Sequence, residues 1–505
     1  MPTTRSVEVE RKYDVGDDAV LPSLADLPGV ARVDPPVVHE MSAVYFDTPD
    51  LRLASRRITL RRRSGGSDAG WHLKLPGGPD ERLEIHEPAG PDPDAVPAAL
   101  LSLVRAHTRD RPLAPVARLD TRRAVHLLRG PAGEPLAEAA DDRVRAQTLP
   151  PGADPTRWRE WETELAGGPR DLLDAAGDLL TAHGARRSAH PTKLARALGP
   201  RLPDPAPDPP APRRKGPAGD VPLAYLHTQV RELAVQDPRV RLDAPDAVHR
   251  MRVATRRARS ALGTYRALLD AGAAEHLRAE LRWLAGVLGQ ARDTEVMHDR
   301  LRDLLAAEPA DTDTGPASRR VDATLGKRYR DAHDEVLRAL DGDRYLGLLD
   351  GLDTLLAEPP LTPRAHRKAR AVVPELVDRD ARRLRRAVRD ALEAPGGTGA
   401  DPSLHEARKR GKRLRYAAEA ATPLHPRRAA RLAQAAQAVQ QLLGEHQDSV
   451  VTRETLRELG TEAYADGEDA FIYGRLHGLE QARALEAETR FRQRWSKDPP
   501  VPFGK

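Results

Sequence analysis

The sequence predicts an α+β protein of several domains: an N-terminal eight-stranded antiparallel β-barrel that encloses a tunnel, and a C-terminal all-α part of two related helical bundles. Three observations indicate this fold. Short segments of alternating polarity fill the first 199 residues, a proline-rich stretch follows them, and helical periodicity begins near residue 223. We therefore expect domains at residues 1–199 and 223–495, joined by a linker at residues 200–222.

Composition limits the class of protein before any motif is considered. Of the 505 residues, 39% are hydrophobic and only 4% aromatic, so small aliphatic side chains must fill most of each core. The chain contains no cysteine, which excludes disulfides and zinc–thiolate sites. Because the sequence has neither a signal-type apolar stretch nor a run of 18 apolar residues, we expect a cytoplasmic protein without a membrane partner.

Eight segments of the N-terminal part have the alternation that is typical of half-buried strands, and turns rich in glycine or proline separate them. Eight antiparallel strands are enough to close a barrel around a small ligand. The segments are residues 7–13, 40–46, 58–63, 70–75, 82–88, 116–128, 135–140 and 159–165.

The first and the last of these strands each carry two glutamates on one face. Glu8 and Glu10 alternate with valines in the first strand, and Lys12 continues their row. Glu162 and Glu164 form the second pair, in the last strand. Carboxylate oxygens are the ligands that hard divalent cations prefer, so the four glutamates suit a Mg²⁺ ion bound beside an anion.

Basic side chains are expected on several walls of the same barrel. Arg61 and Arg63 share one strand face, Lys74 lies on the next strand, and Arg82 lies on the strand after it. Guanidinium groups match the geometry of phosphate oxygens, whereas lysines act as point charges. The pattern therefore favours a phosphorylated anion inside the barrel.

Residues 203–210 read Pro-Asp-Pro-Ala-Pro-Asp-Pro-Pro, a sequence that forms neither a helix interior nor a central strand. It predicts a semi-rigid linker. From residue 223 onward, the Ala/Leu/Arg periodicity predicts helices almost throughout, with loops near residues 309–318 and 395–402.

The helical part contains an internal repeat. A His–Arg pattern at residues 249–259 recurs at residues 405–415, and in both copies a Leu-Gly pair and then an aspartate follow downstream. Helix positions i, i+3, i+7 and i+10 fall within an arc of roughly 80°, so each copy predicts one basic ridge. Like charges at this spacing repel one another, which favours a bound anion. The ridges consist of His249, Arg252, Arg256 and Arg259, and of His405, Arg408, Lys412 and Arg415.

The order of motifs in the N-terminal part, over about residues 3–199, resembles the CYTH family of triphosphate tunnel metalloenzymes. The helical part, over about residues 220–490, resembles the CHAD domain, which is built around paired histidines and binds inorganic polyphosphate. The CYTH-like motifs are Glu-x-Glu-x-Lys at 8–12, Tyr-Phe-Asp-Thr at 45–48, Leu-Arg-Arg-Arg at 60–63, Leu-Lys at 73–74, Arg-Leu-Glu at 82–84, Thr-Arg-Arg at 121–123, Asp-Asp at 141–142, Glu-x-Glu at 162–164 and Pro-Thr-Lys-Leu at 191–194.

The resemblance implies a tunnel in which acidic residues hold Mg²⁺ or Mn²⁺ and basic residues grip a triphosphate. The implied metal ligands are Glu8, Glu10, Asp142, Glu162 and Glu164. The implied substrate-binding residues are Lys12, Arg61, Arg63, Lys74, Arg82, Arg123 and Lys193. Glu162 or Glu164 is expected to take the proton of the attacking water, and Lys74 to stabilise charge on the phosphates. The eight ridge residues are the implied polyphosphate-binding residues.

Together the two parts predict metal-dependent hydrolysis of inorganic triphosphate or polyphosphate, with the helical part anchoring the protein to polyphosphate, including polyphosphate granules. Two alternatives stay open. One is a protein that grips polyphosphate without cleaving it, and the other is a triphosphatase for thiamine triphosphate or a nucleotide. We expect no specific nucleic-acid partner, because few aromatic residues accompany the basic ridges.

Overall fold

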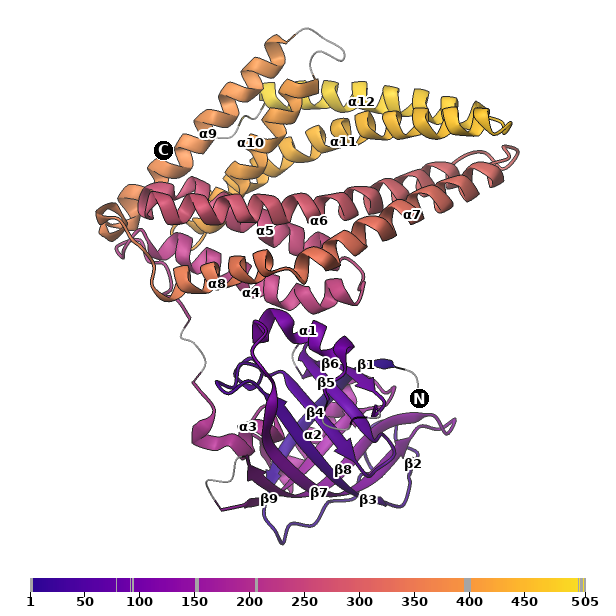
Figure 1. Cartoon of the computed structure of the whole chain (residues 1–505), viewed down its shortest axis with the longest axis vertical. Coiled ribbons are helices and arrows are strands. Elements are labelled where there is room, and N and C mark those ends of the chain that lie inside the picture. Colours follow the sequence, from indigo (N-terminus) through magenta and orange to yellow (C-terminus); the bar gives the residue numbers. More distant parts are fainter. Residues whose placement is uncertain are drawn as a thin grey trace. The chain divides into compact units, whose positions relative to one another are not determined.

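The protein forms two compact units, Met1–Ala206 and Pro207–Lys505, in a computed structural model of the chain (Figure 1). Each unit is described by itself below. The structure describes residues 3–78, 80–90, 92, 95–149, 154–204, 208–394, 401–497, 499 and 503.

Eight antiparallel strands close into a barrel in the first unit, which confirms the predicted fold class. Around the barrel the order is β1-β6-β5-β4-β3-β7-β8-β9, and β1 closes the ring by pairing with β6 through its first half and with β9 through its second. The strands are β1 (Thr4–Val15), β3 (Val37–Asp47), β4 (Thr59–Ser64), β5 (Gly70–Pro76), β6 (Glu81–Glu87), β7 (Ala114–Arg129), β8 (Pro135–Thr148) and β9 (Thr156–Leu165). Two short strands, β2 (Arg32–Val33) and β10 (Arg186–Arg187), pair with β7 and β1.

The largest difference from the predicted strands is in β8, which was expected to end at residue 140 but continues to Thr148. Ion pairs between strands keep this charged stretch in the sheet. Asp141 points outward and accepts two hydrogen bonds from Arg159 at 2.8 and 2.7 Å, whereas Asp142 points into the barrel toward Arg123. Alternation of polarity alone does not reveal a strand whose two faces are both charged.

The first strand has its carboxylates inside and a valine outside. Glu8 and Glu10 are each only 8% exposed, whereas Val7 is 65% exposed on the outer surface of the barrel. Val7 therefore lies on the open outer face of the strand. A buried acidic face requires cations within the barrel.

An apolar layer closes one end of the barrel interior. The short helix α3 (Lys193–Leu198) begins at Thr192, whose Oγ1 accepts a hydrogen bond from Ala195 N at 2.8 Å. Leu194 and Leu198 of this helix pack in one cluster with residues of four strands, β3, β7, β8 and β9. Those residues include Leu119, Val144 and Trp158. The polar interior therefore extends only from this layer to the opposite end.

Two longer helices, neither of them predicted, cover parts of the barrel's outer surface. Helix α1 (Ala98–Thr108) buries Leu100, Leu103 and Val104. Helix α2 (Arg170–Ala182) packs against β1 and β9. Short 3₁₀ helices occur at Ala54–Arg56 and Gly199–Arg201.

The second unit is helical, and among the helices described none combines the length and the apolar character needed to cross a membrane. Its helices are α4 (Asp220–Arg241), α5 (Ala247–Thr264), α6 (Ala271–Ala306), α7 (Gly315–Leu340), α8 (Asp343–Ala357), α9 (Ala369–Glu393), α10 (Asp401–Ala420), α11 (Pro426–Ala465) and α12 (Phe471–Lys497), with 3₁₀ turns at Arg266–Leu268 and Pro363–His366. Helix α4 begins three residues before the predicted start. The predicted loop near residue 309 lies between α6 and α7. Most of the loop predicted at residues 395–402, and residues 205–207 of the linker, lie outside the described residues.

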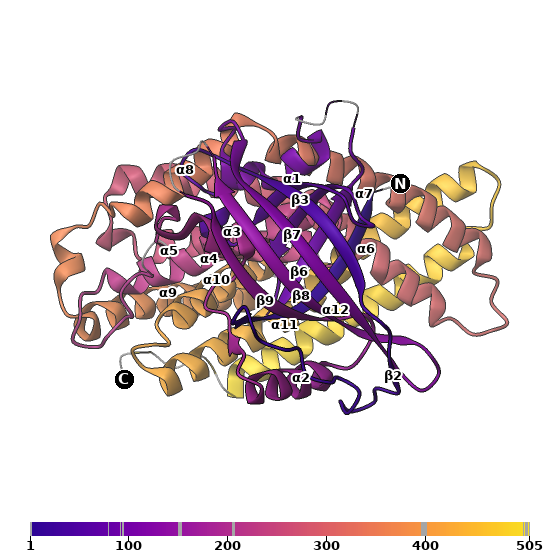
Figure 2. The same ribbon diagram turned by 90° about the horizontal axis from the view of Figure 1, so that it is seen from below.

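The internal repeat appears as two sets of four helices, α4-α5-α6-α7 and α9-α10-α11-α12, in which each helix packs against the next. Each set ends in a long antiparallel helical hairpin, α6–α7 in the first and α11–α12 in the second (Figure 2). The helices that carry the two basic ridges, α5 and α10, contact each other. The repeated halves therefore meet at the ridges.

Candidate active site

A cavity of about 420 Å³ occupies the polar part of the barrel, and charged side chains of both signs line it. All seven predicted substrate-binding residues line this cavity, as do four of the five predicted metal ligands. The fifth, Asp142, is completely buried behind the cavity wall. The charged lining consists of Glu8, Glu10, Lys12, Arg61, Arg63, Asp68, Lys74, Arg82, Glu84, Arg123, Glu138, Glu162, Glu164 and Lys193.

The seam between β1 and β9 brings the two predicted glutamate pairs together. Glu10 lies opposite Glu164 in the strand register, and Lys12 lies opposite Glu162. The ammonium of Lys12 is 2.6 Å from Glu10 Oε2 and also contacts Glu162. Two segments 150 residues apart in the sequence thus form one acidic wall.

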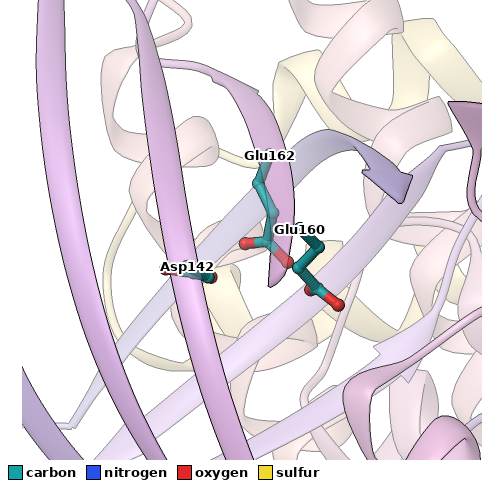
Figure 3. A group of neighbouring side chains, drawn as sticks. All are labelled: Asp142, Glu160 and Glu162. Atoms are coloured by element: carbon teal, nitrogen blue, oxygen red, sulfur yellow. The ribbon is translucent and has the colours of Figure 1, made fainter. Parts of the chain in front are cut away.

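Three carboxylates, of Asp142, Glu160 and Glu162, place oxygens within 4.8 Å of one another, an arrangement that could hold a metal ion (Figure 3). The Lys193 ammonium already contacts all three. Its Nζ lies 2.8 Å from Asp142 Oδ2 and 2.7 Å from Glu160 Oε1, and it also contacts Glu162. Arg123 donates two hydrogen bonds to Asp142, at 2.8 and 2.6 Å. Much of the charge of this group is therefore compensated by the chain itself.

The two glutamates of the last strand differ in their surroundings. Burial raises the pKa of Glu162, but contacts with Lys12, Lys193 and Arg123 outweigh it and hold this pKa well below its usual range. Glu164 has no hydrogen bond or ion pair within the described part of the chain. Burial, aided by repulsion from the neighbouring glutamates, raises its pKa to about 7. Glu164 is therefore the carboxylate with room for a new partner.

Glu8 and Glu10 also differ. Burial raises the pKa of Glu8 to about 8, although the Lys74 ammonium is 2.5 Å away. Burial acts on Glu10 as well, but Lys12 and other cations outweigh it and lower its pKa to about 2. Glu8, Glu10 and Glu164 thus offer oxygen ligands in a crowded acidic wall, which fits a hard divalent cation such as Mg²⁺.

The opposite wall carries more cations than nearby anions. Tyr45 Oη accepts a hydrogen bond from Arg61 Nη1 at 3.3 Å, and the buried Nε of Arg61 has no hydrogen-bond partner among the described residues. Arg63 contacts Asp68, yet burial and repulsion from Arg61 and Arg123 lower its pKa. Guanidinium groups held this way can bind an oxyanion without rearranging.

Some residues that line the cavity or are buried beside it were not among the predicted site residues. Glu160 continues the same-face row of Glu162 and Glu164, so extending the alternation by two residues would have found it. Glu84 pairs with Lys74 in the β5–β6 register, and its cross-strand position depends on that register. Tyr45 belongs to the Tyr-Phe-Asp-Thr motif, but its contact with Arg61 comes from pairing between β3 and β4.

In the helical unit, the two ridges share one packing detail. Arg252 Nη1 lies 3.0 Å from Asp293 Oδ1, and Arg408 Nη2 lies 3.6 Å from Asp448 Oδ1. In each copy the guanidinium lies against a glycine of the next helix, Gly289 or Gly444, and its buried Nε has no hydrogen-bond partner in the part of the chain that the structure describes. The repeated Leu-Gly pair and aspartate thus surround the repeated arginine.

Four ridge residues, Arg252, Arg256, Arg408 and Lys412, form a cation cluster where α5 and α10 meet. Within the residues that the structure describes, Arg256 and Lys412 have no acidic partner. Burial, followed by repulsion from Arg256, Arg408 and Arg252, lowers the pKa of Lys412 to about 6. Beside the cluster lies a groove of about 880 Å³ between α10, α11 and α12.

The other ridge residues lie in different surroundings. Arg415 pairs with Glu419 at 2.8 Å. Burial lowers the pKa of Arg259, and repulsion from neighbouring arginines, including Arg278 and Arg282, lowers it further. His405 Nδ1 is 2.8 Å from Gln447 Oε1. Burial lowers the pKa of His405 and likewise that of His249.

Family models match both parts of the chain, a CYTH domain at residues 6–198 and a CHAD domain at residues 224–457. The chain belongs to the proteins that join a CYTH domain to a CHAD domain. Both predicted resemblances are thereby confirmed. CYTH proteins are metal-dependent triphosphatases or cyclases, so this chain is an enzyme of the phosphoryl-transfer or hydrolase kind. CHAD and CYTH domains in general are associated with polyphosphate and triphosphate binding.

Relatives of this CYTH–CHAD chain extend over almost its whole length. The uncharacterized proteins MT2285 and Rv2226, from two strains of Mycobacterium tuberculosis, are each 42% identical to it over 493 residues, which cover 94% of this chain and 93% of theirs. PptA from Streptomyces chartreusis is 26% identical, with a TM-score of 0.47, over 56% of this chain and 100% of its own. The CHAD domain of the plant Ricinus communis is 23% identical, with a TM-score of 0.43, over 58% of this chain and 96% of its own.

Proposed function

We propose that the barrel hydrolyses phosphoanhydride bonds of inorganic triphosphate or polyphosphate with the help of Mg²⁺ or Mn²⁺, and that the helical unit binds polyphosphate. The observation that carries the first half is the division of the cavity into two walls. One wall is crowded with carboxylates, and the other holds arginines with few anionic partners. A phosphate chain with a bound divalent cation complements both.

The residues that would hold the metal are Glu8 and Glu10, with Glu162, Glu164 and Asp142 beside them. A divalent cation bound there supplies charge neutralisation at the phosphate oxygens and lowers the pKa of a bound water. The chain's own cations orient the substrate. Arg61, Arg63, Arg82 and Arg123 donate hydrogen bonds to phosphate oxygens, and Lys74 stabilises charge on the leaving phosphate.

Of the two glutamates expected to act as general base, Glu164 is favoured. It has no partner among the described residues, and its pKa of about 7 lies near the physiological pH at which a base is most effective. Glu162 is held by three cations and has a depressed pKa, so it is a weak proton acceptor. Its role is to fix Lys12, Lys193 and Arg123.

The helical unit is proposed to bind polyphosphate at the cation cluster. Within the described ranges, the buried Nε atoms of Arg252 and Arg408 have no hydrogen-bond partner, and Arg256 and Lys412 have no ion pair with an acid. These groups offer unused donors for phosphate oxygens. The adjoining groove, which includes Arg408 and Lys497, extends this surface beyond the cluster. A thin, flexible polyanion fits such a groove, and the same contacts would bring the protein to polyphosphate granules.

The decisive experiment measures phosphate release from tripolyphosphate, ATP and thiamine triphosphate by the full-length protein, with Mg²⁺, with Mn²⁺ and with EDTA. Metal-dependent release that is fastest from tripolyphosphate supports the proposal. Faster release from ATP or thiamine triphosphate would instead identify an organic triphosphatase. Tight binding of tripolyphosphate without any release would identify a protein that only binds it.

A further inference from the structure

The groove of about 880 Å³ beside the cation cluster carries a row of cations of its own. Arg408 of the cluster lines the groove, and the last two turns of α12 contribute Arg490, Arg494 and Lys497. Their spacing of four and then three residues places these three side chains, the α12 row, on one face of the helix. Seven residues of helix advance about 10 Å, so the α12 row follows the length of the groove wall.

The two carboxylates in the groove wall are paired with cations of the same wall. Glu445 Oε2 accepts a hydrogen bond from Arg490 Nη2 at 2.6 Å, and Asp448 Oδ1 lies 3.6 Å from Arg408 Nη2. The lining holds four cations against these two acids, so the groove as a whole is positively charged. A cationic groove of this kind concentrates polyanions from solution.

The internal repeat shows how the groove arises. In this part of the chain the second copy follows the first at an offset of 155 residues, as Gly289 and Gly444 show. In the first copy, α8 packs on α6, and the guanidinium carbon of Arg344 lies 4.3 Å from the ring centre of Trp283. The counterpart of Trp283 is Ala438, which lines the groove. A small side chain thus stands where the first copy has an indole in contact with another helix.

The α12 row is also specific to the second copy. Buried positions of α7 and α12 match at the same offset, for example Val336 and Phe491. The residues of the first copy that correspond to the α12 row are not basic; they are Glu335, Ala339 and Gly342. The two copies therefore both contribute to the cluster but differ beyond it.

We propose that the groove is a second subsite for polyphosphate, which binds the phosphates of a long chain that extend past the cation cluster on the side of the second copy. This inference rests on the proposed function of the helical unit. A tripolyphosphate ion is too short to contact the cluster and the whole α12 row at once, whereas a long chain contacts both. Because joining two contacts on one chain raises its affinity, the groove makes the helical unit selective for long chains. The α12 row lies beyond residue 457, where the match to the CHAD domain ends.

Two changes test the groove in different ways. Replacing Arg494 and Lys497 together with alanine removes two charges and leaves the pair of Arg490 and Glu445 in place. Ala438→Trp introduces the side chain of the first copy and fills the groove without changing any charge.

Each change has a matched control. Arg382 and Arg386, exposed on α9, are replaced together with alanine as the control for charge. Ala482→Trp, at an exposed position of α12 outside the groove lining, is the control for the added indole. The measurement is equilibrium binding of labelled long-chain polyphosphate and of tripolyphosphate to the full-length protein. EDTA prevents metal-dependent hydrolysis, and thermal unfolding checks that each variant folds.

We expect the double alanine variant at 494 and 497 to bind long-chain polyphosphate roughly tenfold more weakly than its control, the combined contribution of two exposed charged contacts. The slope of log K against the logarithm of the salt concentration should become shallower by about 1.4, because each lost contact contributes roughly 0.7. Ala438→Trp should weaken long-chain binding by roughly threefold or more, because the indole occupies the space of the chain. Tripolyphosphate binding by both variants should stay within about twofold of the controls.

Three results would overturn the inference. They are long-chain binding by the double alanine variant that equals its control, an equal loss for tripolyphosphate and for long chains, and unchanged long-chain binding by a folded Ala438→Trp protein. If Ala438→Trp does not fold, the double alanine variant decides alone. Failure of the wild type to bind long-chain polyphosphate would refute the proposed function of the helical unit, whereas wild-type binding that neither variant weakens would refute the groove alone.

Discussion

The barrel cavity and the cation cluster between α5 and α10 both gather basic side chains, but they balance the charge in different ways. In the cavity, Lys193 alone contacts three carboxylates, and Arg123 donates two hydrogen bonds to Asp142. In the cluster, Arg256 and Lys412 have no acidic partner among the described residues. A network of ion pairs fixes donors in advance, as a reaction site requires, whereas unpaired cations favour an anion from solution.

The largest expected effect tests the acidic wall. Changing Glu164 to Gln removes a carboxylate that has no partner within the described ranges, and should lower kcat for tripolyphosphate hydrolysis by roughly 10²- to 10⁴-fold, the usual contribution of a general base. Polyphosphate binding by the helical unit should not change. Phosphate release and a binding assay measure the two effects. Glu40→Gln, on the outer face of β3, is the matched control, and an unimpaired Glu164→Gln enzyme would remove this residue from the reaction.

The second prediction tests the cluster. Replacing Arg252, Arg256, Arg408 and Lys412 together with alanine should weaken long-chain polyphosphate binding more than 100-fold. The binding constant should also depend less steeply on salt. The slope of log K against the logarithm of the salt concentration should become shallower by about 3, because each of the four lost contacts with a single-stranded polyanion contributes roughly 0.7. Tripolyphosphate hydrolysis should be unaffected.

The control for the fourfold change removes the same charge elsewhere. Arg370, Arg382, Arg386 and Arg389 are exposed on α9, so their replacement with alanine removes at least as much positive charge as the fourfold change in the cluster. A salt titration of labelled polyphosphate compares the two proteins. Equal binding by both would show that the cluster is not the polyphosphate site.

A third prediction separates binding arginines from structural ones on the same helix. Arg413 Nε is 3.0 Å from the buried Asp380, which also accepts a hydrogen bond from Thr264 Oγ1 at 2.6 Å. Arg413→Ala should lower the free energy of unfolding by about 2–3 kcal/mol. The loss is smaller than for a buried charge without any partner, because Asp380 still accepts the hydrogen bond from Thr264 and still pairs with Arg383. Chemical denaturation measures the loss. Polyphosphate affinity should match the wild type, and a large fall in affinity would contradict the distinction.

The smallest expected effect concerns pH. Lys412 has a pKa of about 6 in the free protein, so it is largely neutral at pH 7, and a bound polyanion favours its protonated form. Binding then takes up a proton, so affinity should fall as pH rises above about 6, by at most about tenfold per pH unit. His249 and His405, whose pKa values burial lowers, should add their contribution below their ordinary pKa of about 6.5.

Lys412→Arg is the matched variant for the pH prediction, because arginine keeps its charge throughout this range. Its polyphosphate affinity should vary less between pH 6 and 8 than that of the wild type. Calorimetry in two buffers of different ionisation enthalpy measures the protons taken up directly. Identical proton uptake by wild type and Lys412→Arg would assign the titration to other groups.

The sequence was informative wherever a residue's role follows from its place in a single strand or helix. Alternation assigned Glu8, Glu10, Glu162 and Glu164 to one face of their strands, and the structure places all four in the cavity lining. It failed where both faces of a strand are charged, as in the second half of β8. The assignments of metal ligands, substrate-binding residues and polyphosphate-binding residues stay predictions until they are measured.

The sequence by itself determined the two-part fold, the family, and which side chains share a face, because periods of 2 and 3.6 residues act within one element. Only the tertiary structure decided which side chains meet across elements. It placed Lys193 among three carboxylates, left Glu164 without a partner among the described residues, and brought Arg256 and Lys412 together where α5 contacts α10. Those contacts depend on barrel closure and helix packing between segments as far as 194 residues apart, which no local period encodes.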